Sequence, residues 1–218
     1  MKLIFIFLAI ALAITLPIKK KNMTWRQSIL KALYPVIMLK GKIFGNQKDI
    51  KLNVNQSAPA ESFYNLTAIK NNGDTLAFSS LKGKKVLIVN TASDCGFTGQ
   101  YEELEKLHQQ FGDRLIVLGF PANDFKEQEK KSDTAIAEFC KINYGVSFQL
   151  MQKSHVIKGP EQHPVFKWLS NASANGWSNH QPVWNFSKYI IDENGALQAF
   201  YTQMVSPLDQ SIKSQILK

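Results

Sequence analysis

The sequence predicts an α/β fold in which a central mixed β-sheet is flanked by helices. Three observations predict this fold class. Residues 86–90 and 115–120 are short apolar, β-branched runs of the kind that form buried strands, and a helical pattern lies between them. A hairpin and a helix close the chain. A strand, a crossover helix and a second strand in this order predict a parallel pair.

The first strand is followed by a helix predicted over residues 99–111, where apolar side chains recur on one face. The second strand is followed by a helix predicted over residues 133–143, with Ser132 as its N-cap. A short helix is expected at residues 163–170. The sheet is therefore expected to be covered by helices.

The end of the chain predicts an antiparallel addition to this sheet. Asn194-Gly195 is a strong two-residue hairpin signal between predicted strands at 189–192 and 197–201. Residues 207–217 predict a closing helix. Parallel strands with a crossover helix, then a hairpin and a helix, are typical of a thioredoxin-like fold.

Composition limits the function classes. The chain has 218 residues and a mass of 24.6 kDa, and its 44% hydrophobic and 20% charged residues are those of a globular protein. The net charge is +9, and much of the excess lies in the first fifty residues. That basic stretch is interleaved with aliphatic residues, which favours an anionic lipid surface over nucleic acid.

The chain has two cysteines, Cys95 and Cys140. This number argues against a disulfide framework. Two cysteines and four scattered histidines also make a poor structural zinc site, so no metal is predicted. On composition alone, the two cysteines are either a buried inert pair or a redox pair.

The N-terminal segment allows three interpretations. Residues 3–18 form an apolar run of about 16 residues, slightly shorter than a spanning helix needs, and Lys19-Lys20-Lys21 follows at once. An uncleaved anchor that keeps the rest of the chain cytoplasmic is favoured by this positive flank. The alternatives are a secretory signal cleaved after Ala11-Leu12-Ala13, which would export the protein, or a buried helix.

Residues 24–44 have apolar side chains at helical spacing with lysines between them, which predicts an amphipathic helix on a membrane surface. Residues 46–61 are polar and aperiodic and are interpreted as a linker. The expected organisation is an anchor or signal segment at 1–21, a basic amphipathic segment with linker at 22–61, and the α/β domain at 62–218.

Cys95 lies in a short polar loop between the strand at 86–90 and the helix at 99–111. A cysteine near a helix N-terminus is expected to be stabilised as the thiolate, the nucleophilic form. Gly96 lets a substrate approach the backbone. The alternative, a cysteine chosen for packing, fits this polar loop poorly.

One motif contains this cysteine, and two more follow further along the chain. They are Asn90-Thr91-Ala92-Ser93-Asp94-Cys95-Gly96-Phe97-Thr98, then Gly119-Phe120-Pro121-Ala122-Asn123-Asp124-Phe125 with Gln128-Glu129, and finally Trp184-Asn185-Phe186-Ser187-Lys188-Tyr189. In this order and at these spacings they closely resemble the motifs of glutathione peroxidases. The resemblance covers roughly residues 62–217.

The resemblance implies a thioredoxin fold and a peroxidase whose nucleophile is the thiol of Cys95. It implies that Gln128, Trp184 and Asn185 complete the catalytic site. Their amide and indole N–H groups are neutral donors that can stabilise the sulfur and the leaving oxygen without a fixed charge. Without the joint pattern, these three would be ordinary loop or core residues. No bound cofactor is implied.

Cys140 is implied to be a resolving cysteine. Many non-animal members of the family carry a second cysteine in a similar Phe-Cys context before a Tyr-Gly-Val stretch, and this chain has Phe139-Cys140 and then Tyr144-Gly145-Val146. In those members the sulfenic acid condenses with the second thiol, and thioredoxin reduces the disulfide. The alternative is a structural cysteine. Local unwinding of the helix is expected if the two cysteines start apart.

The chain departs from the family pattern at several loop positions. Ala122 stands where relatives often have a third cysteine, and Gly99 replaces a common Pro. Asp124 and Lys126 stand where Gln and Gly are usual, and Lys130-Lys131 replaces Pro-Gly. These changes affect the expected loop shape and peroxide preference rather than the nucleophile.

Several alternatives remain. A peroxide sensor that passes a disulfide to a partner shares the first chemical step. A membrane-tethered disulfide reductase would need a second cysteine at Thr98, and a peroxiredoxin would need Thr or Ser at Ala92. Thioredoxin and glutathione are both possible reductants, with thioredoxin favoured. Oxidative stress is the expected setting, and the short segment 171–182 favours a monomer.

Overall fold

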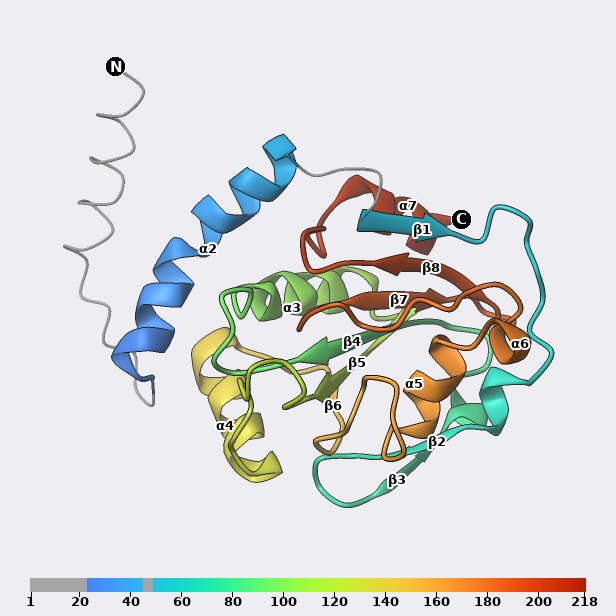
Figure 1. Ribbon diagram of the computed structural model, residues 1–218, viewed down its shortest axis with the longest axis horizontal. Coiled ribbons are helices and arrows are strands. Elements are labelled where there is room, and N and C mark those ends of the chain that lie inside the picture. Colours follow the sequence, from blue (N-terminus) through green and yellow to red (C-terminus); the bar gives the residue numbers. More distant parts are fainter. Residues whose placement is uncertain (1–22, 45–48) are drawn as a thin grey trace.

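The computed structural model describes residues 23–44 and 49–218 (Figure 1). Its main sheet has six strands in the order β1-β8-β7-β4-β5-β6. The central pair, β4 (Lys85–Thr91) and β5 (Leu115–Pro121), is parallel, and β6 (Gln149–Leu150) continues the parallel part. The antiparallel part is made by β7 (Lys188–Ile191), β8 (Leu197–Tyr201) and β1 (Ile50–Leu52). The predicted mixed α/β sheet is therefore confirmed.

Strand β4 is buried on both faces because helices and loops cover each side of the sheet. Its side chains alternate between two core clusters: Leu87 and Val89 pack on one side, and Val86 and Ile88 on the other. This is why residues 86–89 of the strand are a continuous apolar run rather than an alternating one. The loop that carries Cys95 begins where this strand ends.

Two helices pack over the first core cluster (Figure 1). Helix α3 spans Gln100–Phe111 and buries Tyr101, Leu104 and Leu107 in this cluster. Helix α4 spans Asp133–Tyr144, and the Ser132 hydroxyl caps it by accepting from the Ala135 N–H. Both helices agree with the sequence-based expectation to within one or two residues.

The remaining helices cover the two faces of the sheet. Helix α5 (Pro164–Leu169) and the short helix α6 (Ala172–Asn175) pack against the second cluster, and α7 (Gln210–Leu217) packs against the first. The predicted hairpin joins β7 and β8, and Gly195 adopts the positive φ of 85° that its turn requires. The short helix, the hairpin and the closing helix that were predicted in the C-terminal half are therefore all present.

The segment expected to be a linker is partly ordered into the sheet. Strand β1 pairs with β8 through the register Ile50↔Tyr201, and the buried Asn53 side chain donates to the Leu197 carbonyl oxygen at 3.1 Å. The sheet therefore begins before residue 62. Helical turns η2 (Phe63–Asn65) and η3 (Phe78–Leu81) and a small hairpin of β2 (Thr67–Ile69) and β3 (Thr75–Ala77) follow.

Helix α2 (Trp25–Phe44) lies along the outside of the domain, beside α3 and α4 (Figure 1). Its existence agrees with the predicted helix at 24–44. No helix within residues 23–44 and 49–218 has the length and apolar character needed to cross a membrane. The apolar run at residues 3–18, predicted to be an anchor or signal, lies outside the described residues.

Candidate active site

The loop after β4 carries Cys95 and is held by hydrogen bonds at both ends. The Asp94 N–H donates to the Gln128 carbonyl oxygen at 3.0 Å, which ties the loop to the second sequence motif. The Thr98 hydroxyl donates to the Cys95 carbonyl oxygen, as does its backbone N–H at 3.2 Å. These bonds fold the chain into a tight turn just before α3, with the Cys95 side chain buried inside.

Four neutral donors surround the Cys95 sulfur. They are the backbone N–H groups of Gly96 and Phe97 and the side chains of Trp184 and Asn185, which all hydrogen-bond to Cys95. The Asn185 amide also donates to the Gln128 Oε1 at 3.0 Å. The structure therefore brings together Cys95, Gln128, Trp184 and Asn185, the four residues that the sequence singled out.

The pKa of the Cys95 thiol is raised to about 11, because burial opposes the charged thiolate more strongly than the four donors favour it. This differs from the expectation that a helix N-terminus would favour the thiolate. The physical reason is that Cys95 precedes the first residue of α3 and is enclosed by apolar side chains. The donors lower the pKa only in part, so the resting thiol is protonated at neutral pH.

Asn90 couples the first sequence motif to the third. Its fully buried side chain donates to the Trp184 carbonyl oxygen at 3.1 Å and accepts from the Ser187 N–H at 3.0 Å. Between them, Phe186 adopts a φ of 70°, in a region that non-glycine residues rarely occupy. The amide of Asn90 thus holds the strained turn that aims Trp184 and Asn185 at the sulfur.

Trp184 is covered by residues of the second motif. The Phe125 ring lies 5.5 Å from the Trp184 ring, and the Lys126 ammonium lies 5.7 Å from its centre. Lys126 and Glu127 both have a φ of 51°. Lys126 occupies the position where the family usually has Gly, so the turn that requires a left-handed backbone is kept here without glycine.

Glu129 is a buried carboxylate at the end of the second motif, and its role is not evident from the sequence. Its Oε2 accepts from the backbone N–H and the hydroxyl of Ser93, both at 2.7 Å, and its Oε1 has no partner. Burial raises its pKa to about 6, although the two bonds from Ser93 lower it. Its burial could not be deduced from the sequence alone, and it anchors the loop next to Cys95.

Replacing Glu129 by glutamine is expected to change how stability depends on pH. Because the folded-state pKa of about 6 exceeds the ordinary value of 4.5, the folded protein binds this proton more tightly than the unfolded chain. The stabilisation is complete below pH 4.5 and is lost as the pH rises through 6. Urea denaturation should show wild type losing about 2 kcal/mol relative to Glu129→Gln between pH 4 and 7. A constant difference over this range would contradict the assignment.

Lys188, in the third motif, is a second buried charged residue whose role is not evident from the sequence. Its ammonium donates to the Gln100 Oε1 at 2.8 Å, the Phe186 carbonyl oxygen at 2.7 Å and the Thr202 carbonyl oxygen at 3.2 Å. Burial lowers its pKa to about 7. These three bonds connect the start of α3, the strained turn of the third motif and the end of β8.

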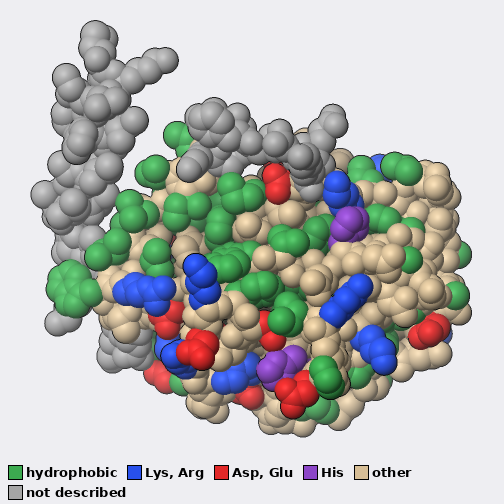
Figure 2. Space-filling model, in the orientation of Figure 1, with side chains coloured by type: hydrophobic (Ala, Val, Ile, Leu, Met, Phe, Trp, Pro, Cys, Tyr) green, Lys and Arg blue, Asp and Glu red, His purple; other side chains and the backbone are tan. Residues whose placement is uncertain are grey.

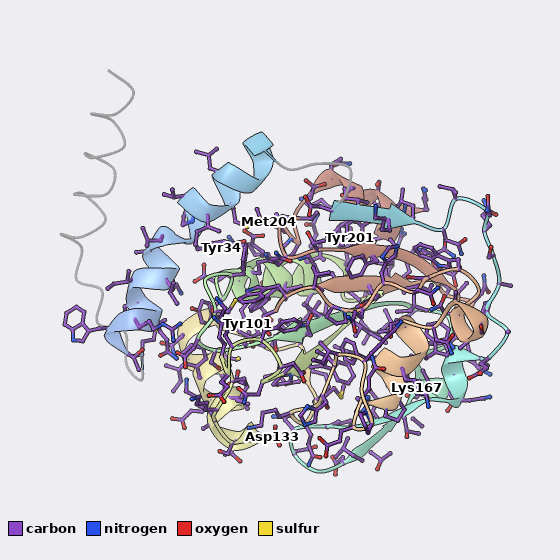
Figure 3. All side chains as sticks on the ribbon, viewed as in Figure 1. Tyr34, Tyr101, Asp133, Lys167, Tyr201 and Met204 are labelled. Carbon is purple, nitrogen blue, oxygen red and sulfur yellow. The ribbon has the colours of Figure 1, made fainter. Side chains whose placement is uncertain are left out.

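Cys140 is fully buried in the second half of α4, and it belongs to the same core cluster as Cys95. Both cysteines are free thiols. Burial raises the pKa of Cys140 to about 12, partly offset by a hydrogen bond from Tyr101. The fully buried Tyr101 projects from α3 (Figure 3). The predicted resolving cysteine is thus in the core but is not paired.

The end of α4 is closed by a glycine cap that includes the backbone of Cys140. The Val146 N–H donates to the Cys140 carbonyl oxygen at 3.3 Å, and the Gly145 N–H donates to the Lys141 carbonyl oxygen at 3.0 Å. Gly145 has the φ of 69° that this cap favours. Releasing Cys140 from the helix would break the first of these bonds.

Comparison with known proteins agrees with the fold and the motifs. Residues 63–170 match the family described as glutathione peroxidase. The crystal structure of Trgpx in apo form is similar, with a TM-score of 0.54 and 32% identity, over 73% of this chain and 97% of that one. The crystal structure of T. cruzi GPX1 is similar too, with a TM-score of 0.56 and 26% identity, over 72% of this chain and 95% of that one.

The curated relatives are shorter than this chain. The glutathione peroxidase homolog BsaA of Staphylococcus epidermidis is 45% identical over 159 residues, which cover 72% of this chain and 98% of the relative. Glutathione peroxidase-like peroxiredoxin 2 of Saccharomyces cerevisiae is 42% identical over 160 residues, with the same coverage. The motifs, the fold and these relatives together show that the chain belongs to the glutathione peroxidase family and is a thiol-dependent peroxidase.

Proposed function

We propose that the protein reduces hydroperoxides with the Cys95 thiol, resolves the oxidised sulfur with Cys140 and is recycled by thioredoxin. The substrates are hydrogen peroxide and organic or lipid hydroperoxides, and the setting is oxidative stress. In the first step the Cys95 thiolate attacks the distal peroxide oxygen, so that an S–O bond forms and the O–O bond breaks. The leaving oxygen takes a proton and departs as water or an alcohol, and Cys95 becomes a sulfenic acid.

The arrangement of four neutral donors around the sulfur supports this proposal most directly. A thiol with a pKa of about 11 needs stabilisation of its charge as it reacts, and the Trp184 and Asn185 side chains point their donors at it. Gln128, held by Asn185 at 3.0 Å, adds an amide next to the same site. Donors without a fixed charge suit a reaction that passes negative charge from sulfur to the leaving oxygen.

The resolving step is proposed to use Cys140. Its thiol attacks the Cys95 sulfenic acid, an S–S bond forms, and the hydroxyl group leaves as water with the thiol proton. The two cysteines are buried and unbonded at rest, so the last turn of α4 opens at its glycine cap to let them meet. Two thiols of thioredoxin are then oxidised to a disulfide as the Cys95–Cys140 disulfide is reduced.

Replacement of Cys140 by serine tests the resolving role. The full chain in a mild detergent would be assayed for peroxide-dependent NADPH oxidation with thioredoxin and its reductase, and in parallel with glutathione and its reductase. Cys140→Ser is expected to lose at least 100-fold of the thioredoxin-supported rate while still consuming one equivalent of peroxide per chain.

The control is Ser147→Ala, which removes a hydroxyl bonded to Glu105 beyond the end of α4 without touching either thiol. Full thioredoxin-supported turnover of Cys140→Ser would contradict the resolving role. Retained turnover with glutathione alone would replace it by a one-cysteine cycle. If wild type forms the disulfide but turns over poorly with thioredoxin, the protein is better described as a sensor that oxidises a specific partner.

A further inference from the structure

Helix α2 has two apolar faces, and only one of them is in contact with the rest of the described chain. At 100° per residue, Trp25, Ile29, Val36 and Leu39 fall within an arc of about 80° on the outer side. They are 74%, 50%, 52% and 56% exposed. Figure 2 shows hydrophobic side chains gathered over this helix. We call these four residues the outer stripe.

The opposite face of α2 is packed on the catalytic loop. The Gln27 amide donates to the Ser93 carbonyl oxygen at 3.4 Å, two residues before Cys95. The Ile37 side chain lies 3.5 Å from the position that a Cβ on Gly96 would take. The helix therefore runs directly beside the peptide segment that carries the nucleophile.

Polar contacts fix α2 to α3, which follows Cys95, and to α4, which contains Cys140. The Lys31 ammonium pairs with the Glu102 carboxylate at 2.5 Å and donates to the Asn143 carbonyl oxygen at 2.9 Å. The Tyr34 hydroxyl donates to the Glu103 carboxylate at 2.7 Å. In Figure 3, Tyr34 lies on the side of α2 that faces α3. Since Lys31 reaches both α3 and the end of α4, α2 is held in one orientation.

The packing of α2 requires a residue without a side chain at Gly99. A Cβ at Gly99 would lie 2.4 Å from the Tyr34 ring, closer than any side chain could approach. Gly99 stands where the family commonly has Pro, so the departure makes room for α2. The family match begins at residue 63, after this helix. Helix α2 is thus an addition to the peroxidase domain that the domain accommodates.

The sequence before α2 indicates what covers the outer stripe. Residues 3–18 are apolar, Lys19-Lys20-Lys21 follow, and only three residues separate these lysines from Trp25. A chain that inserts such a run into a bilayer places its next residues at the lipid–water boundary, where tryptophan and basic side chains are favoured. Arg26, which directly follows Trp25 of the outer stripe, is exposed and could contact anionic headgroups at this boundary.

We propose that the outer stripe of α2 lies in the surface of an anionic lipid bilayer and that the inner face holds the Cys95 loop at that surface. The helix would then present the site proposed above to hydroperoxides of membrane lipids. This substrate preference rests on the proposed function, whereas the lipid contact does not.

Tryptophan quenching by brominated phospholipids tests the lipid contact. The full chain would be reconstituted in vesicles of phosphatidylcholine with about 30% phosphatidylserine, with and without bromine on the acyl chains. Because the chain has four tryptophans, the signal of each probe is obtained by difference. The two comparisons are wild type against Trp25→Phe, and Trp25→Phe/Leu39→Trp against Trp25→Phe. The second probe lies at the far end of the outer stripe, so it separates a helix that lies on the bilayer from a chain held only by its N-terminus.

The proposal expects quenching at both ends of the outer stripe, with at least a twofold loss of each probe's fluorescence. The variant Ile29→Ser/Val36→Ser with the Leu39→Trp probe should lose at least half of that quenching. The matched control, Val54→Ser/Leu217→Ser with the same probe, replaces two apolar residues elsewhere that are more exposed than Ile29 and Val36, and it should quench like its parent. Quenching at Trp25 without quenching at position 39 would overturn the proposal. So would a vesicle-independent dimer that buries both probes.

Turnover separates this inference from the proposed function. Ile29→Ser/Val36→Ser should reduce a phospholipid hydroperoxide in vesicles at least tenfold more slowly than wild type, with an unchanged rate for cumene hydroperoxide. Equal losses on both peroxides would contradict a role of the outer stripe in presenting lipid substrate. If wild type reduces neither peroxide, the proposed function fails, while the quenching result still decides whether α2 binds lipid.

Discussion

Replacing Cys95 by serine is expected to lower the rate of peroxide reduction by at least 1,000-fold. A serine hydroxyl is a far weaker nucleophile, and its oxygen cannot form the sulfenic acid on which the cycle depends. The buried side chain is surrounded by Gly96, Phe97, Trp184 and Asn185, and the smaller hydroxyl leaves their positions largely unchanged. Stopped-flow measurement of peroxide loss and trapping of the sulfenic acid with dimedone would check this expectation.

The contrast with Cys140→Ser makes the result interpretable. That variant retains the nucleophile and should still consume one equivalent of peroxide and trap with dimedone. If Cys95→Ser instead kept the wild-type rate, the assignment of the nucleophile would be wrong, and Cys140 would be the remaining thiol in the chain.

Replacing Asn185 by alanine is expected to lower the rate of the first step by about 100- to 1,000-fold, the usual cost of losing one preorganised donor. The change removes a hydrogen bond to Cys95 and frees the Gln128 amide from its 3.0 Å contact. The pKa of the Cys95 thiol, already raised to about 11 by burial, should rise further because a donor that lowers it is gone. Rapid-mixing kinetics with peroxide and the pH profile of thiol alkylation would measure both effects.

Val183→Ala is the matched control because Val183 lies in the same loop with its side chain 53% exposed. It should leave both the peroxide rate and the alkylation profile unchanged. A slower peroxide reaction of Asn185→Ala with an unchanged alkylation profile would show that Asn185 acts through Gln128 and not on the sulfur.

The parts of the fold that could be predicted from sequence are those with a strong local signal, such as an apolar run, a cap residue or a turn dipeptide. Strand β4 is a continuous apolar run, and Ser132 and Asn194-Gly195 mark a helix start and a hairpin. Strand β1 was missed because it has three residues with a lysine at its centre, and it forms only by pairing with β8. Such short strands depend on tertiary partners rather than on their own sequence.

In the candidate site, too, some residues could be predicted from the sequence and others could not. Recognisable motifs single out Cys95, Gln128, Trp184 and Asn185, and the structure places them together. Glu129 and Lys188 were given no role, because the sequence does not reveal that a charged side chain is buried and bonded.

The docking of α2 was also beyond prediction. The sequence predicted an amphipathic helix, but its apolar side chains lie on both sides, so their spacing alone did not show which side meets the protein. The contacts of Tyr34 and Lys31 decide this, and both depend on where α3 and α4 lie.

The fit of Tyr34 over Gly99 means that α2 and the loop before α3 depend on each other, both in evolution and in protein design. If a helix like α2 were grafted onto a relative with proline at this position, its tyrosine would clash with the proline before the helix could reach the loop. The reverse exchange, a proline placed in this chain, would lift the helix without altering any residue around the sulfur. Glycine and tyrosine at these two positions should therefore be inherited as a pair, and chimaeras should carry both.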